Sequence, residues 1–125
     1  MIIRGIGKQY YEAISFFSDK LRLPDSILID FTYSNKMNVH GLCWRNERHH
    51  FCIKLQTKQT KRDLLDTIAH EMVHVKQYIN NEIDDSLNTW KGQYMRKDEP
   101  WEKEAEDLAI CLVNQFTGDH FIRIK

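Results

Sequence analysis

The sequence predicts a single α+β domain that spans residues 1–125. Three segments carry apolar residues at spacings of three and four, the period of an amphipathic helix, and three short β-rich segments lie between the first two of them. A length of 125 residues suits one domain, and no Pro/Gly/Ser-rich linker divides the chain. We therefore expect an N-terminal helix, a mixed or antiparallel sheet of three or four strands, a second helix beneath that sheet, and a closing helix.

The first half of the chain supplies the first helix and the strands. Apolar side chains in residues 8–23 recur at helical spacing, and a proline follows directly. Residues 26–33 are rich in β-branched and aromatic side chains, which predicts a strand. Residues 39–44 and 49–55 predict two more strands, and the polar turn between them predicts a hairpin.

The second half supplies the other two helices. Thr60 is a candidate N-cap with Asp63 three residues on, and the helix that follows is expected to end near Asn80. Pro100 suits the first turn of the last helix, and Gly118 is its candidate C-cap. The residues between these helices are mostly polar.

Charge balance and cysteine content narrow the class of protein. Lys plus Arg and Asp plus Glu each number 18, and a net charge of zero argues against a nucleic acid as the main ligand, because phosphate binding usually needs a basic excess. Three cysteines without a close pair or a Cys-x-x-Cys exclude a disulfide framework and a zinc knuckle. The start of the chain has no signal-peptide pattern, and no stretch approaches roughly 20 apolar residues, so we expect no membrane span and a cytoplasmic location.

Residues 70–74 read His-Glu-Met-Val-His, the His-Glu-x-x-His pattern, inside the expected second helix. Positions i and i+4 share a helix face about 5–6 Å apart at Cβ, so His70 and His74 can bind one tetrahedral zinc ion. Glu71 stands beside the first ligand, where it can take a proton from the attacking water and pass it to the leaving amine. A chance pair of histidines on a solvated face is the alternative, and the capped helix with apolar residues on its buried side argues against it.

A catalytic zinc ion normally takes three protein ligands and leaves a fourth position open, so a third ligand must come from elsewhere in the chain. The acidic residues of the last helix are the candidates. Glu102 and Glu106 stand four apart and share a face, whereas Glu104 points away from them. If Glu102 binds the metal, Glu106 can orient a ligand histidine. The alternative is a solvated acidic face, and spacing alone does not decide between the two.

The motif and the last helix together resemble the gluzincin arrangement, in which His-Glu-x-x-His precedes a helix reading Glu-x-x-Ala-[Asp/Asn/Glu]. The chain is similar to small metallopeptidases of the IrrE/ImmA type and to phage-encoded SprT-like proteins, most specifically in the Pro-Trp-Glu-x-Glu-Ala block of residues 100–105. The resemblance covers residues 64–113. It implies a zincin-like minimal domain, Glu102 as the third zinc ligand, Glu106 as the acid behind a ligand histidine, and the host cytoplasm as the location of a phage-encoded protein.

The chain departs from one branch of these relatives. Eukaryotic SprT-related proteases take their third ligand from a histidine shortly after the motif, and here no histidine follows His74 before His120. A DNA-dependent role is therefore not carried over from them.

Two tyrosines and one strand are candidates for handling the substrate. Tyr94 and Tyr78 can stabilise the oxyanion of a tetrahedral intermediate, although such tyrosines more often pack half-buried, and we assign the catalytic role to Tyr94. In zincins the strand beside the cleft pairs with an extended peptide through its main chain, and residues 49–55 are our candidate. The alternative is an internal strand with no free edge.

These features predict a monomeric zinc metalloendopeptidase that cleaves a protein or peptide. A second hypothesis is a zinc-binding interaction module, with absent or latent hydrolysis, that binds a host or partner protein. The intact Glu71 argues against this second hypothesis, because a pure binder needs no general base. A nucleic-acid-associated protease is a third reading, suggested by the SprT-like similarity and opposed by the zero net charge.

Overall fold

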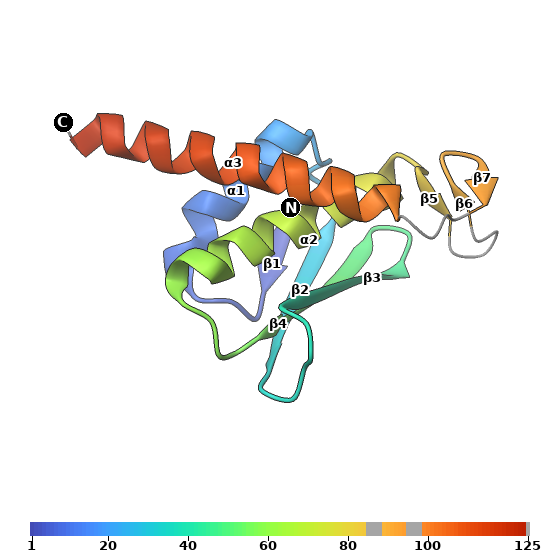
Figure 1. Ribbon diagram of the computed structural model, residues 1–125, viewed down its shortest axis with the longest axis horizontal. Coiled ribbons are helices and arrows are strands. Elements are labelled where there is room, and N and C mark those ends of the chain that lie inside the picture. The colour runs from blue at the N-terminus through green and yellow to red at the C-terminus, as the bar shows by residue number, and fades with distance from the viewer. Residues whose placement is uncertain (85–88, 95–98, 125) are drawn as a thin grey trace.

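A four-stranded mixed sheet forms one layer of the molecule (Figure 1). The computed structural model describes residues 1–84, 89–94 and 99–124, and of Tyr94 and residues 119–124 it describes the backbone alone. The strands lie in the order β1-β2-β4-β3, with the bounds β1 (Ile2–Arg4), β2 (Leu28–Ser34), β3 (Gly41–Glu47) and β4 (His50–Gln56). β2 pairs in parallel with β1 and β4, and β3 pairs with β4 as an antiparallel hairpin. The hairpin is confirmed, and β3 lies at an edge of the sheet.

Three helices lie on one side of this sheet (Figure 1). A short 3-10 turn, η1 (Lys8–Tyr10), leads into α1 (Tyr11–Leu21), and the long helices are α2 (Lys61–Ile79) and α3 (Pro100–Ile124). A second, small sheet of β5 (Ile83–Asp84), β6 (Thr89–Trp90) and β7 (Gln93–Tyr94) precedes α3. The predicted α+β class, with three helices and a mixed sheet, is confirmed.

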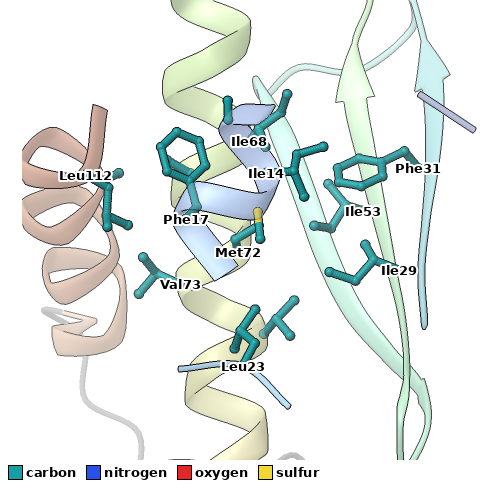
Figure 2. Close-up of a cluster of buried hydrophobic side chains, with 14 of the residues drawn as sticks. Ile14, Phe17, Leu23, Ile29, Phe31, Ile53, Ile68, Met72, Val73 and Leu112 are labelled. Atoms are coloured by element: carbon teal, nitrogen blue, oxygen red, sulfur yellow. The ribbon is translucent and has the colours of Figure 1, made fainter. Parts of the chain in front are cut away.

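Helix α2 is buried between the sheet and α3 (Figure 2). On one side Met72 and Ile68 face apolar side chains of β2 and β4, and on the other side Val73 lies toward Leu112 of α3. Side chains of β2 and β4 point alternately to the two faces of the sheet, so that the inner face is apolar and the outer face polar. The buried residues of the inner face are Ile29, Phe31, Phe51, Ile53 and Leu55. Because α2 is covered on two sides, even its polar residues Glu71, His74 and Gln77 are buried.

Small residues let α3 approach α2. Ala105 is fully buried and Ala109 nearly so. The expected C-cap at Gly118 is wrong, because α3 continues through it to Ile124. A single glycine costs a helix about 1 kcal/mol relative to alanine, which the rest of a long helix can offset. None of the described helices is long and apolar enough to cross a membrane.

The position of the predicted peptide-binding strand is also wrong. Residues 49–55 form β4, which is hydrogen-bonded to β2 on one side and to β3 on the other. Both edges of β4 are therefore occupied, and the strand with a free edge next to α2 is β3. Strand β1, which the sequence reading did not predict, extends the sheet at its far edge.

Candidate metal centre

The His-Glu-x-x-His motif lies in the middle of α2, as predicted. The helix begins at the predicted cap, where Thr60 Oγ1 accepts a hydrogen bond from the backbone N–H of Asp63 at 3.1 Å. One turn of helix then brings the rings of His70 and His74 to a centroid distance of 5.0 Å. The ligand atoms of His70, Glu71 and His74 all lie within 4.8 Å of one another, so this group can hold a metal ion.

Glu102 reaches the same place from the first turn of α3. Its Oε1 lies 2.5 Å from Nε2 of His74, and its Oε2 lies 3.7 Å from Nε2 of His70. Both imidazoles thus present Nε2 to one carboxylate. Two nitrogen donors and one oxygen donor match the ligand set of a catalytic zinc ion that keeps one position open.

Two neighbouring carboxylates of this helix, Glu104 and Glu106, do not join the pair of histidines. Glu106 is exposed, and the described residues form no hydrogen bond between it and His70 or His74, so the expectation that it orients a histidine is not met. Glu104 instead accepts hydrogen bonds from Lys76 and Gln77, each at 3.0 Å.

The charged groups of the site shift one another's protonation. Burial raises the pKa of Glu71, and the neighbouring imidazoles only partly oppose this. Burial lowers the pKa of His74, but the hydrogen bond with Glu102 and the charge of Glu71 outweigh it, so the net shift is upward. The imidazoles of His70 and His74 hold the pKa of Glu102 below its usual range. Glu102 is therefore ionised and suited to a cation, while Glu71 is a stronger base than an ordinary carboxylate.

A cleft between β3 and α2 opens on both sides of these residues. On one side lies a cavity of about 250 Å³ with aromatic and apolar lining, including Tyr78, Ile83 and Trp101. On the other side lies a cavity of about 510 Å³, whose lining includes Val39, Asp63 and His70. Four residues line both cavities: Gly41, Leu42, Glu71 and Glu102. An extended chain laid along β3 would therefore pass over Glu71 and the candidate metal ligands.

Gly41 allows β3 to come this close to α2. A Cβ atom at this position would lie 2.6 Å from Cγ2 of Thr67 and 3.1 Å from both Cγ and Oε2 of Glu71. No side chain fits there without movement of the strand or the helix. The absence of a side chain at position 41 thus sets the width of the cleft at Glu71.

The two candidate tyrosines differ in what the structure describes. Tyr78 lines the smaller cavity together with Glu71 and His74, so the helix brings it to the site. The backbone of Tyr94 belongs to β7, but its side chain lies outside the described part of the chain, and its role stays a prediction.

Sequence reading missed Gln77, which is fully buried next to the site and hydrogen-bonds His74. Its position three residues after His74, a candidate ligand, on the same helix face is a signal that could have found it. In comparisons with known proteins, no family model, curated protein or solved structure matches the chain. The function is therefore inferred from the residues and distances of this site.

Proposed function

We propose that this protein is a zinc-dependent metallopeptidase with a zincin-like domain of the gluzincin type. The observation that carries the proposal is that His70 and His74 of α2 and Glu102 of α3 present their ligand atoms to one another at the floor of a cleft. A site of that donor set, buried on one side and open on the other, suits catalytic zinc. When bound, zinc polarises the carbonyl to be cleaved and makes water more acidic.

Glu71 has the environment of a general base. Its carboxylate lines both cavities, so it faces the space where water and the scissile bond would meet. Burial raises its pKa toward the range in which a carboxylate transfers protons efficiently near neutral pH. Glu71 takes the proton from water and delivers it to the leaving nitrogen.

The substrate in this proposal is an extended segment of a protein or peptide. The free edge of β3 offers main-chain groups for pairing, directly above α2. Leu42 on this strand lines both cavities and is 47% exposed, which favours contact with an apolar part of the substrate. β3 thus takes the role that the sequence assigned to residues 49–55.

The test compares wild type with Glu71→Gln, and Glu106→Gln is the matched control from the exposed face of α3. We expect about one zinc ion per chain in all three proteins by elemental analysis. Casein cleavage or self-cleavage by Glu71→Gln should fall by about 10²–10⁴-fold, the usual contribution of a general base, while the control keeps its rate.

The outcomes separate the candidate functions. Cleavage by Glu71→Gln at the wild-type rate would contradict the role of Glu71. A wild-type protein that binds zinc but hydrolyses neither casein nor itself would favour the interaction module. A wild-type protein that retains no zinc would contradict the metal site itself.

A further inference from the structure

We propose that Gln77 is a positioning residue that fixes which nitrogen of His74 faces the metal site and holds the start of α3 against α2. The inference rests on the proposed zinc site and adds a residue that acts through His74 and Glu102. Gln77 has no solvent exposure, and its amide lies between the ring of His74 and the first turn of α3.

The neighbours of Gln77 determine the orientation of its amide. One end of the amide lies 2.9 Å from the carbonyl oxygen of Trp101 and 3.0 Å from Oε1 of Glu104. The carbonyl oxygen of Trp101 can only accept a hydrogen bond. The carboxylate of Glu104 can also only accept, because Lys76 at 3.0 Å keeps it ionised. The NH₂ group must therefore occupy that end, and the amide oxygen must face His74.

This orientation determines the tautomer of His74. The Nδ1 atom of His74 lies 2.7 Å from Oε1 of Gln77, which has no proton to give. Nδ1 must therefore carry the proton and donate it. Without a metal, Nε2 donates a second proton to Glu102, and when the ring gives up that proton the lone pair resides on Nε2, the atom that would face the metal. A histidine needs this form to bind a metal through Nε2, and an outer hydrogen bond commonly enforces it.

Gln77 also connects the two helices that supply the ligands. Its NH₂ group binds the carbonyl of Trp101, the residue directly before Glu102. The ring of His74 and the backbone that carries Glu102 are thus held by opposite ends of one buried amide. Among the described residues, no side chain other than Glu102 makes a polar contact with the ring of His70, so this support is specific to His74.

The test uses Gln77→Met, which keeps the length of the side chain and removes its acceptor and donors. Gln56→Met is the matched control, because Gln56 also donates to a backbone carbonyl, that of Met37 at 2.7 Å, and accepts a backbone N–H, that of Lys58. Zinc affinity is measured by competition with a chelator. The His74 Nδ1 proton is followed by ¹H–¹⁵N NMR in the metal-free and zinc-loaded proteins.

We expect Gln77→Met to bind zinc about 10–100-fold more weakly than wild type, the usual loss when an outer partner of a ligand is removed. Its His74 Nδ1 proton should exchange rapidly with water, whereas wild type should show a slowly exchanging signal. Gln56→Met should keep both the wild-type affinity and the signal. Wild-type affinity in Gln77→Met, or protonation of His74 on Nε2 in the zinc-loaded wild type, would overturn the proposal.

A double exchange keeps the test decisive if Gln77→Met does not fold. Gln77→Glu keeps an acceptor that can face His74 but places two carboxylates against each other, so it should bind zinc weakly, whereas adding Glu104→Gln removes this repulsion and supplies a donor facing residue 77. The double variant should recover affinity and the Nδ1 signal, and a failure to exceed Gln77→Glu would contradict the inference. If wild type binds no zinc, the signal in the metal-free protein still decides the role of Gln77, separately from the proposed function.

Discussion

The Nε2 atom of His74 lies 2.5 Å from Oε1 of Glu102, although the two residues belong to different helices. The histidine is almost fully buried, whereas the carboxylate is partly open to the cleft. In the proposed metal site, the buried imidazole of His74 and the carboxylate that it keeps ionised would supply two ligands, and His70 would supply the third.

Removal of Glu102 should therefore abolish tight metal binding. We expect Glu102→Ala to weaken zinc binding by more than about 100-fold, since loss of an outer partner alone costs about 10–100-fold. Glu106→Ala removes a carboxylate one turn further along α3, on an exposed position, and should bind zinc like wild type. Chelator competition measures both, and equal losses in the two variants would indicate a nonspecific effect of charge.

Gly41 should tolerate no side chain. Gly41→Ala puts a Cβ atom 2.6 Å from Thr67 and 3.1 Å from Glu71, so β3 or α2 must move. Overpacking of this kind costs about 1–3 kcal/mol in the free energy of unfolding, and the displaced Glu71 should lower hydrolysis as well. Gly118→Ala is the control, because a Cβ atom at this position has no atom within 4 Å. It should leave the free energy of unfolding unchanged or raise it by up to about 1 kcal/mol. Urea unfolding of the two variants checks the contrast.

Glu71 should destabilise the metal-free protein. Burial raises the pKa of Glu71 in the folded protein above its value in the unfolded chain. Folding therefore favours the protonated carboxyl group, and the free energy of unfolding falls as the pH rises from the unfolded-state pKa through the folded-state pKa. Glu71→Gln removes this cost and should raise the free energy of unfolding at pH 7 by about 0.5–2 kcal/mol, as substitutions that relieve an active site commonly do. The gain should vanish below pH 4, where both states are protonated. Urea unfolding at pH 7 and at low pH measures it, and a less stable variant at pH 7 would contradict the effect of burial.

The outer face of the sheet should respond to acid through Asp30. Its carboxylate accepts two hydrogen bonds from Arg4, at 2.7 and 2.8 Å, and lies 2.6 Å from Nε2 of His50. Arg4 above all, and His50 with it, lower the pKa of Asp30 to about 2 from the usual 3.8. A lowered folded-state pKa gives stability that is present above 3.8 and is lost as pH falls through about 2. Thermal unfolding between pH 5 and 2 should thus be less pH-dependent in Asp30→Asn than in wild type, and the exposed Asp25→Asn should match wild type.

Local patterns in the sequence predicted the local parts of the fold. The Thr60 cap, the helix that carries His70 and His74, and the β3–β4 hairpin depend on residues near one another in the chain. Helical spacing and capping are short-range effects, which explains why they can be read without a structure.

The order of the strands could not be read in the same way. Phe51, Ile53 and Leu55 alternate with polar residues, and this pattern suits any strand with one covered face, whether central or at an edge. The parallel pairings of β2 with β1 and β4 join distant segments, and no local pattern encodes them. The role of Gln77 was hidden for a related reason, because two of its partners, Trp101 and Glu104, lie on another helix.

The candidate ligands are divided unequally along the chain. His70 and His74 belong to α2. Glu102 belongs to the 25-residue helix α3, which follows α2 in the sequence. A growing polypeptide on the ribosome therefore carries a two-histidine fragment of the candidate site until α3 has been synthesised and has docked. In the proposed enzyme, the capacity to cut peptide bonds would arise only after α3 has docked onto α2.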